Sequence, residues 1–339
     1  MAPSSLTVAV TGPTGDVGKA FLRALDAEPR VGRVLGMARR PFDPAAIGVA
    51  KTEYRQGDVL DRPAVEALLG EADVVVHLAF LILGGIEETR RINLEGSGNV
   101  FEAAAASERV KRLVYTSSVA AYGFHADSPQ PLTEGLEPRG TEEHYYSAQK
   151  AELEGVLERA LKGSGTDAYV FRPCIVAGPD ALMMLESIPF VQAAAKLPSP
   201  VRAALGAAPL VKPVLPDPGV PFQLVHHDDV AAALVAAVTG EGKPAVYNLA
   251  GDGTLTASDL ASCLGWYSVP IPSAAVDATA QFVAHAPLMP AEAQWVNAFR
   301  RPVVMDTSRA RQGLGWAPRH DALETLRDTV AAAREQGLV

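Results

Sequence analysis

Short apolar runs alternate with amphipathic stretches over the first half of the chain. Apolar and β-branched residues concentrate at 6–10, 33–38, 52–56, 73–78, 112–116 and 168–171, which predicts six strands. Between them, residues 16–28 place Val17, Phe21 and Leu25 on one helical face and Arg23 and Asp26 on the other. Residues 86–107 and 143–161 show the same helical pattern. Strands that alternate with helices predict βαβ units around a parallel sheet, and therefore a doubly wound α/β fold.

The pattern changes after residue 179. Residues 180–221 are rich in proline, which removes backbone donors and breaks helices, so this stretch predicts a separate lobe. Residues 223–249 return to strand, helix and strand, and we expect them to re-enter the sheet before a final α-rich segment. We therefore predict one α/β domain from residues 1–178 and 222–250, and a smaller, mainly C-terminal lobe from residues 179–221 and 251–339.

Composition and charge narrow the function classes. The 339 residues include 30 Lys+Arg and 39 Asp+Glu, a net charge of −9, without any basic block. This balance disfavours nucleic acid and anionic membranes as partners. The two cysteines are far apart and form no CxxC motif, which disfavours a disulfide framework or a zinc cluster. Because the N-terminus does not resemble a leader and no apolar run reaches about 20 residues, we expect a soluble cytoplasmic protein.

A glycine-rich turn follows the first predicted strand. Gly12, Gly15 and Gly18 stand in the segment TGPTGDVG, and Gly18 opens the first predicted helix. Glycines allow a tight turn and a close approach of the backbone to a ligand, and a helix N-terminus attracts negative charge. The order of strand, glycine turn and helix predicts a site for the pyrophosphate of a dinucleotide, and therefore a Rossmann domain.

The chain resembles the extended short-chain dehydrogenase/reductase family, the NAD(P)-dependent epimerase/dehydratase group. The resemblance rests on the spacing GxxGxxG and on segments that follow the family's order: QGDVLD at 56–61, VVHLA at 75–79, INLEGSGNV at 92–100, LVYTSSVAAYG at 113–123, YYSAQK at 145–150, RPCIVAGP at 172–179, VHHDDVA at 225–231 and DTSRARQGLGWAP at 306–318. It implies that the Rossmann domain binds NAD(P) and that the lobe binds a small-molecule substrate.

Three residues are candidates for catalysis. Tyr146 and Lys150 stand four positions apart on a predicted helix, so both side chains share one face. A neighbouring ammonium favours phenolate, so we expect Tyr146 to act as an acid or base near neutral pH. The resemblance implies that Lys150 also holds the nicotinamide ribose and that Ser118, at the end of a predicted strand, hydrogen-bonds the substrate oxygen. Taken without the other motifs, a solvated Tyr–Lys pair and a capping serine are the alternative interpretations.

The resemblance also predicts the cofactor contacts. They are Gly12, Thr14, Gly15, Asp16, Val17 and Gly18 in the glycine turn, Arg39 and Arg40 after the second strand, Asp58 and Val59 at the adenine, Leu78 and Ala79 after the fourth strand, and Asn93, Tyr146, Lys150 and Pro173. Asn93 either holds a relay water or the helix backbone in place, or makes a structural bond to the adjacent strand. Pro173 either packs on the nicotinamide or is a turn residue.

The end of the second strand indicates which dinucleotide is bound. NAD-selective Rossmann domains normally carry an acidic residue about 20 positions after the glycine turn. Ala38 occupies that position here, and it is followed by Arg39 and Arg40, whose guanidinium groups suit the 2′-phosphate of NADP. We therefore favour NADP. NAD is the alternative, in which Arg39 only stacks on the adenine.

The residues around the catalytic segment separate the family's reactions. By resemblance, dehydratases place acidic residues directly after the catalytic Ser or Thr, whereas Val119 and Ala120 follow Ser118 here. Epimerases of nucleotide sugars bring an arginine just before the strand of the VHHDD segment, and none stands between Arg202 and that strand. The lobe instead has apolar residues that either line an apolar pocket or form its own core: Leu182, Met183, Met184, Leu185, Ile188, Phe190, Val191, Leu210, Val211 and Phe222.

These features lead to three functional hypotheses. The first is an NAD(P)-dependent carbonyl reductase or alcohol dehydrogenase that acts on a hydrophobic or aromatic small molecule. The second is an NAD-dependent sugar epimerase. The third is a non-catalytic dinucleotide sensor, and the retained serine, tyrosine and lysine argue against it. We expect no metal site, since His77, His226 and His227 lack helical ligand spacing. The helices at 86–107 and 143–161 are candidates for a homodimer interface.

Overall fold

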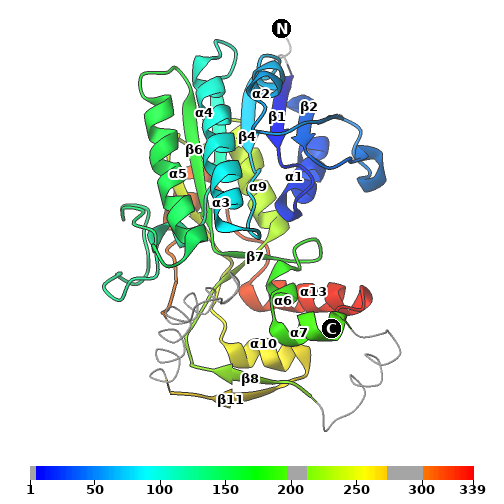
Figure 1. Cartoon of the computed structure of the whole chain (residues 1–339), viewed down its shortest axis with the longest axis vertical. Helices are drawn as coiled ribbons and strands as arrows, with labels where there is room; N and C mark the ends of the chain where they lie inside the picture. Colours follow the sequence, from blue (N-terminus) through cyan, green and yellow to red (C-terminus); the bar gives the residue numbers. More distant parts are fainter. Residues whose placement is uncertain (1–4, 197–211, 273–300) are drawn as a thin grey trace.

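A seven-stranded parallel sheet forms the centre of the computed structural model, which describes residues 5–196, 212–272 and 301–339 (Figure 1). The strand order is β3-β2-β1-β4-β5-β6-β10, and every neighbouring pair is parallel. The strands are β1 (Leu6–Thr11), β2 (Val31–Ala38), β3 (Thr52–Gln56), β4 (Val74–His77), β5 (Arg112–Thr116), β6 (Asp167–Pro173) and β10 (Val246–Leu249). The predicted doubly wound Rossmann fold is confirmed.

Helices cover both faces of the sheet. One face carries α1 (Asp16–Ala27), α9 (His227–Val238) and α12 (Ser308–Leu314), and the other carries α2 (Arg62–Leu69), α4 (Gly96–Ala106) and α5 (Tyr145–Leu161). Along β1, Val8 and Val10 pack toward α1 and α9, whereas Ala9 packs toward α2 and α4. Because both faces are buried, the inner strands carry apolar residues on both sides, which explains their continuous apolar runs, whereas the edge strand β3 (TEYRQ) is polar and partly exposed.

The predicted helix at 86–107 consists of three pieces. The chain forms α3 (Ile86–Arg90), one π-helical turn η2 (Arg91–Glu95) and then α4. A π-helical turn inserts extra backbone into a helix and turns its side chains relative to the regular repeat. Here the turn brings Asn93 to face the loop after β4 and the neighbouring helix α5.

A second layer of elements forms the lobe below the sheet in Figure 1. It contains two small parallel sheets, β7 (Ile175–Ala177) with β9 (Leu224–His226) and β8 (Val214–Asp217) with β11 (Tyr267–Pro270). Its helices are α6 (Met183–Glu186), α7 (Pro189–Ala195), α10 (Ala257–Leu264) and α13 (Ala322–Glu335). The lobe has a core of its own, which includes Leu182, Leu185, Ile188, Val191, Leu260 and Leu326.

The packing divides the chain differently from the predicted boundaries in two places. The segment at 223–227 does not return to the central sheet, because β9 pairs with β7; Leu224 packs in the lobe core and Val225 in the core of the Rossmann domain. Within residues 251–339, α12 packs against β10 and α9, and Ala310 and Leu314 belong to the core of the Rossmann domain. A three-residue apolar run has the same pattern in either sheet, so the sequence alone does not specify its partner.

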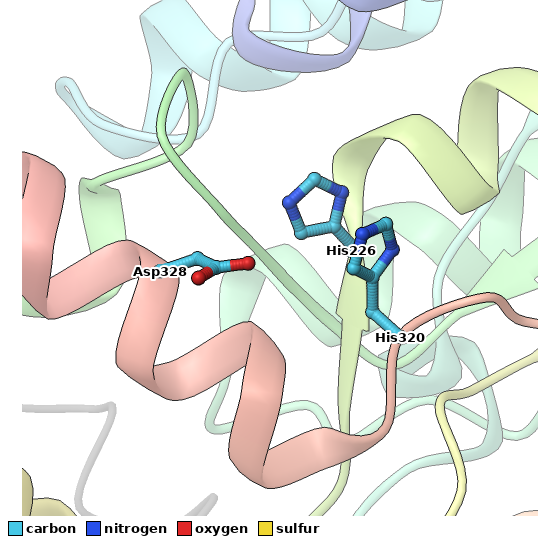
Figure 2. Close-up of side chains that lie close together, drawn as sticks. All are labelled: His226, His320 and Asp328. Atoms are coloured by element: carbon cyan, nitrogen blue, oxygen red, sulfur yellow. The ribbon is translucent and has the colours of Figure 1, made fainter.

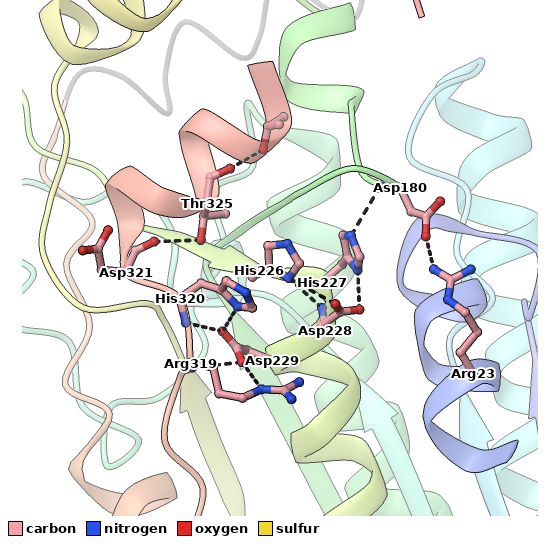
Figure 3. A network of polar contacts seen from close by, with 11 residues as sticks. Arg23, Asp180, His226, His227, Asp228, Asp229, Arg319, His320, Asp321 and Thr325 are labelled. Carbon is pink, nitrogen blue, oxygen red and sulfur yellow. Dashed lines mark hydrogen bonds and ion pairs between the residues drawn. The ribbon is translucent and has the colours of Figure 1, made fainter. Parts of the chain in front are cut away.

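Asp229, in the first turn of α9, joins the Rossmann domain to the C-terminal part of the lobe (Figure 3). Its carboxylate is completely buried and accepts hydrogen bonds from the backbone amides of Arg319 (3.0 Å) and His320 (3.1 Å). The ring Nδ1 of His320 lies 3.1 Å from the same carboxylate, and Trp316 Nε1 donates to the Asp229 carbonyl (2.8 Å). One side chain therefore holds the segment that leads into α13.

A second polar link joins the start of the lobe to α1 and α9 (Figure 3). Arg23 of α1 forms an ion pair with Asp180, which follows β7. The backbone amide of Asp180 donates to Nε2 of His227 (3.3 Å), and Nδ1 of that ring lies 3.0 Å from the Asp228 carboxylate. This hydrogen bond with His227 lowers the pKa of Asp228 to about 2. The segment after β7 and the segment that leads into α13 are thus both anchored at the N-terminus of α9.

We predict that Asp229→Ala lowers the free energy of unfolding by about 3 kcal/mol, because two backbone donors lose their acceptor. The matched control is Asp252→Ala, which removes an exposed ion pair with Arg311 and should cost less than about 1 kcal/mol. Urea unfolding followed by circular dichroism measures both values. Equal destabilisation by the two substitutions would contradict the role assigned to Asp229.

Candidate functional site

The glycine turn lies at the carboxyl end of β1, between the ends of β2 and β4. Gly12 has φ +76°, and a Cβ atom on it would lie 2.6 Å from the backbone nitrogen of Ala79. A Cβ atom on Gly18 would lie 2.5 Å from the Gly12 carbonyl oxygen. Gly15 differs, because it is exposed and a Cβ atom there would meet only the Gly12 oxygen, at 3.6 Å. Close packing of the chain therefore requires glycine at positions 12 and 18. At position 15 no such packing is present, and the glycine leaves the backbone open to a ligand.

The N-terminus of α1 borders this open approach. Gly15 is the N-cap residue and has no side chain that could accept a hydrogen bond. The backbone amides of the first turn, those of Asp16, Val17 and Gly18, therefore have no side-chain cap. Uncapped amides and the helix dipole together suit a negatively charged group. Burial raises the pKa of Asp16, and Lys19 partly opposes that rise. The open glycine and the uncapped helix fit the pyrophosphate of a dinucleotide.

The predicted adenine and ribose contacts surround the same edge. Arg39 and Arg40 are exposed directly after β2, and their carbonyl oxygens accept hydrogen bonds from Gln56 Nε2 (2.9 Å) and from the hydroxyl of Tyr54. Within residues 5–196, 212–272 and 301–339, neither guanidinium takes part in an ion pair. After β3, Asp58 accepts a hydrogen bond from the Leu60 amide (3.0 Å). Both arginines therefore have their backbone held while their charged groups stay open to a ligand.

The segment after β4 closes the other side of the turn. The amide of Leu78 donates to the Thr11 carbonyl (3.0 Å), and the amide of Gly12 donates to the Met37 carbonyl (3.0 Å). After β3, the Val59 carbonyl accepts a hydrogen bond from Asn99 (3.0 Å). The structure thus gathers the predicted residues that follow β1, β2, β3 and β4 along one edge of the sheet, as expected for parallel strands around a switch point.

Ser118, Tyr146 and Lys150 meet beside this edge. Tyr146 and Lys150 lie in the first two turns of α5, which His144 caps by accepting the Ser147 amide at Nδ1 (3.2 Å). Ser118 follows β5 and caps the short helix η3 (Val119–Tyr122), accepting the Ala120 amide at Oγ (3.1 Å). The hydroxyls of Ser118 and Tyr146 are hydrogen-bonded to each other. The three side chains predicted from separate motifs therefore form one cluster.

Burial controls the protonation of this cluster. It raises the pKa of Tyr146, and the hydrogen bond with Ser118 partly counteracts that rise. Burial also lowers the pKa of Lys150 to about 7, against the opposing charge of Glu154. The Lys150 ammonium donates to the Thr116 carbonyl (2.9 Å) and lies 3.9 Å from the centre of the Phe80 ring. The expected lowering of the Tyr146 pKa by the lysine charge is not found: burial raises this pKa, Ser118 rather than Lys150 opposes the rise, and Lys150 Nζ lies 5.9 Å from the centre of the Tyr146 ring.

A buried ion pair behind the cluster was missed at the sequence level. Glu154 lies one turn after Lys150 on α5, and its carboxylate accepts hydrogen bonds from Ser117 Oγ (2.5 Å) and Arg172 Nε (2.9 Å). The side chains of Glu154 and Arg172 are 9% and 3% exposed. The available signal was the spacing of Tyr146, Lys150 and Glu154, four residues apart each time, on one helical face.

The contacts of Asn93 and Pro173 in the structure are with other parts of the fold. The Asn93 amide accepts from the Leu81 backbone nitrogen (2.7 Å) and donates to the Leu81 carbonyl (3.0 Å) and to Gln149 Oε1 (2.8 Å). These contacts agree with the structural interpretation of Asn93, with the loop after β4 rather than a strand as its partner. Pro173 is buried at the end of β6, opposite Leu249 of β10.

The histidines are used within the fold. His77 is buried between Thr11 Oγ1 (2.7 Å, at Nδ1) and Ser97 Oγ (2.8 Å, at Nε2), and burial lowers its pKa to about 3. A neutral imidazole with both nitrogens bonded links β1, β4 and α4. His77 therefore belongs to the framework under the glycine turn.

His226, His320 and Asp328 lie together where α9 meets α13 (Figure 2), with ligand atoms within 4.8 Å of one another. The Asp228 amide donates to Nδ1 of His226 (3.2 Å), which assigns the ring proton to Nε2 and leaves that nitrogen no lone pair for a metal. The rings of His226 and His320 stack 4.0 Å apart at 27°, so their in-plane lone pairs do not converge. The donor set fits the polar junction described above better than a metal centre.

A model of the NAD dependent epimerase/dehydratase family matches residues 8–250. The chain belongs to this family. Among curated relatives, the uncharacterized protein y4nG of Sinorhizobium fredii is 26% identical over 335 residues, 95% of this chain and 77% of that protein. The uncharacterized protein Rv0501 of Mycobacterium tuberculosis is 26% identical over 95% of this chain and 82% of its own length.

Solved structures with the same fold include two with bound ligands. UDP-glucose 4-epimerase of Thermotoga maritima, solved with UDP-glucose, has a TM-score of 0.73 at 20% identity and covers 98% of this chain and 99% of its own. The enzyme WbmG of Bordetella bronchiseptica, solved with NAD, has a TM-score of 0.71 at 19% identity and covers 100% of this chain and 98% of its own.

In the described part of the chain, no helix has the length and apolar character needed to cross a membrane.

The open face of Gly15 leads to a prediction. Gly15→Ala should leave the fold intact, because φ is −77° and the methyl group meets no close neighbour, and the less favourable N-cap should cost at most about 1 kcal/mol. The same methyl group should weaken NADH binding by about tenfold, equal to 1.4 kcal/mol, by obstructing the backbone approach. Fluorescence titration and thermal unfolding measure the two effects.

The control for this prediction is Gly98→Ala in α4, where a Cβ atom also meets nothing within 4 Å. It should stabilise the helix without any change in NADH affinity. Wild-type affinity in Gly15→Ala would show that the dinucleotide does not approach this turn.

Proposed function

We propose that this chain is an NAD-dependent epimerase that transiently oxidises a secondary hydroxyl of a nucleotide sugar. The observation that carries the proposal is the meeting of Ser118, Tyr146 and Lys150 beside the glycine turn. Their hydroxyl and ammonium groups can accept, share and return one proton, which is the acid–base chemistry that alcohol oxidation and ketone reduction both require. The solved structures of similar fold, which include a UDP-glucose 4-epimerase, support the same choice.

Tyr146 is the group that exchanges the proton. As a phenolate, Tyr146 takes the proton from the substrate hydroxyl, and the resulting phenol returns that proton when the ketone is reduced. The Ser118 hydroxyl, whose oxygen accepts the Ala120 amide, donates a hydrogen bond to the Tyr146 oxygen and stabilises the phenolate, in keeping with its lowering of the Tyr146 pKa. Lys150, held by Thr116, contributes positive charge when protonated. A bound nicotinamide would supply the hydride acceptor.

Buried apolar residues after Ser118 argue against dehydration. Val119 and Ala120 are 9% and 4% exposed, so the position where water elimination would need an additional acid or base carries only aliphatic side chains. Epimerisation needs no such group, since one tyrosine serves both the oxidation and the return step. The retained Ser118, Tyr146 and Lys150 also argue against a purely dinucleotide-sensing role.

The second candidate is the carbonyl reductase or alcohol dehydrogenase with a hydrophobic substrate. Phe80 packs edge-to-face on Tyr146 (5.4 Å between ring centres), and Phe124 contacts His144 beside it, which favours an aromatic ligand. The lobe gives less support than expected, because Leu182, Leu185, Ile188 and Val191 form its own core. Leu210 and Val211 lie outside the described residues. The missing arginine before β9 still favours the hydrophobic substrate, whereas the similarity in fold to a UDP-glucose 4-epimerase favours the nucleotide sugar, which we prefer as the substrate class.

We propose further assignments on the same basis. The lobe elements around α6, α7, α10 and α13 would hold the substrate, and the Rossmann domain the cofactor. A homodimer would form through α3, α4 and α5, where Leu83 (46%) and Ile86 (50%) are exposed apolar residues next to α3. A reducing compartment such as the cytoplasm suits the buried Cys174, whose thiol pKa burial raises.

We predict that Tyr146→Phe retains NADH affinity but loses at least about 100-fold in turnover, because the proton acceptor is removed. The matched control is Tyr145→Phe, whose hydroxyl donates to the Ile82 carbonyl and should affect activity little. Activity is measured as sugar epimerisation with UDP-sugars, beside NAD(P)H consumption with aromatic aldehydes and ketones. Near-wild-type turnover in Tyr146→Phe would contradict the assignment, and net consumption with carbonyls alone would favour the second candidate.

The open guanidinium groups of Arg39 and Arg40 support acceptance of NADP beside NAD. We predict that Arg39→Ser with Arg40→Ser weakens NADPH binding at least about tenfold and leaves NADH binding nearly unchanged, since only NADPH carries the 2′-phosphate. Arg159→Ser, at an exposed position near the end of α5, is the control. Equal effects on the two cofactors would contradict a phosphate-binding role.

A further inference from the structure

We propose that Glu154 is a positioning residue for the reaction assigned above: its buried carboxylate holds Ser117, and so fixes the segment that carries Ser118, and it places a negative charge one helical turn after Lys150. The inference rests on the proposed function. Glu154 itself contacts neither the Tyr146 hydroxyl nor, in the described chain, any group assigned to the substrate, so it would act only through its neighbours.

The position of Glu154 links three elements that meet at the site. On α5 it follows Tyr146 and Lys150 at intervals of four residues, so the three side chains lie on one face. Its Oε1 accepts from Ser117 Oγ (2.5 Å), directly before Ser118. Its two oxygens also accept from Arg172 Nε (2.9 Å) and from the terminal guanidinium nitrogen (2.5 Å). One carboxylate thereby connects α5 to the end of β5 and to β6.

Ser117 is held by this contact on one side and by the sheet on the other. Its backbone amide donates to the Phe171 carbonyl of β6 (2.7 Å). The neighbouring Ser118 then turns into η3, whose Ala120 carbonyl accepts from Ser147 of α5 (2.6 Å). The hydroxyl of Ser118 is therefore positioned between two links from α5, one through Glu154 and one through Ser147.

Glu154 also supplies the negative charge that Lys150 needs. Lys150 is 3% exposed, and the groups around it are mostly aromatic or neutral: His77 on β4, Phe80 after β4, Tyr115 and Thr116 on β5, and Tyr146 on α5. Glu154 raises the pKa of Lys150 against the effect of burial. Arg172, on β6, lies on the far side of the carboxylate and shares its charge.

The stability of the fold does not by itself account for the ion pair between Glu154 and Arg172. Arg172 has further partners, the Tyr122 ring (4.5 Å to the centre) and the Leu136 carbonyl (3.4 Å), so it stays partly bonded without the carboxylate. Buried pairs of this kind contribute little net stability compared with apolar residues of similar size. The place of this pair next to Lys150 and Ser118 fits a role in the reaction.

The test compares Glu154→Gln with Glu158→Gln, an exposed glutamate one turn further along the same helix. Glu154→Gln removes the charge and nearly preserves the shape. We expect the pH at which Lys150 loses its proton to fall by about one unit, the effect of removing a nearby opposite charge. The rate constant kcat/KM and NADH affinity should then decline more at pH 8 than at pH 6, whereas Glu158→Gln follows the wild-type profile.

Two further variants keep the outcome decisive. Ser117→Ala preserves the ion pair and removes only the link to the Ser118 segment, so it should lower kcat about tenfold with the wild-type pH profile and NADH affinity. If Glu154→Gln does not fold, unchanged kcat in Ser117→Ala overturns the proposal. Wild-type profiles for kcat/KM and NADH affinity in a folded Glu154→Gln also overturn it. Tyr146→Phe distinguishes a failure of the role assigned to Glu154 from a failure of the proposed function, because full activity in Tyr146→Phe would refute the proposed function.

Discussion

The close approach of Gly12 to Ala79 at the carboxyl edge of the sheet sets the geometry of the whole site. A Cβ atom on Gly12 would lie 2.6 Å from the Ala79 nitrogen, so the turn after β1 and the segment after β4 fit together only with glycine at this position. This contact places the N-terminus of α1 over the edge where the parallel strands end. β5 lies next to β4, and the segment after it brings Ser118 to the same edge.

Burial then determines what the side chains at this edge can do. Lys150, Glu154 and Arg172 are largely removed from water, and each is satisfied by a specific partner rather than by solvent. The low dielectric of such a site strengthens every charge interaction and makes the protonation of Lys150 sensitive to its neighbours. The π-helical turn places Asn93, which bonds both backbone groups of Leu81 and so holds the loop after β4.

The strands of the central sheet could be predicted from the sequence because each is marked by its own short run of residues. Strands buried on both faces read as continuous apolar runs, and all six predicted strands appear close to their expected positions. The run before α9 was assigned to the wrong sheet, since three apolar residues pair equally well with β7 or with the main sheet. The role of the lobe residues Leu182 and Leu185 was also ambiguous, because a protein core and an apolar ligand pocket are lined by the same kinds of side chain.

The candidate site was partly readable from spacing alone. The interval between Tyr146 and Lys150 predicts a shared helical face, but the burial that lowers the pKa of Lys150 involves Phe80 and Thr116, which come from other elements. Glu154 was missed because a glutamate on a helix is usually solvated, and its partner Arg172 lies on a strand that follows α5. Long-range pairings of this kind become visible only when the strands are placed.

The most direct test of the account is a crystal structure of the protein with bound NAD. The account predicts the pyrophosphate at the amides of Asp16 and Val17, against the open face of Gly15, and the nicotinamide ribose beside Tyr146 and Lys150. A dinucleotide bound elsewhere, or a ribose distant from Lys150, would contradict the central claim that the glycine turn and the Ser118–Tyr146–Lys150 cluster form one site.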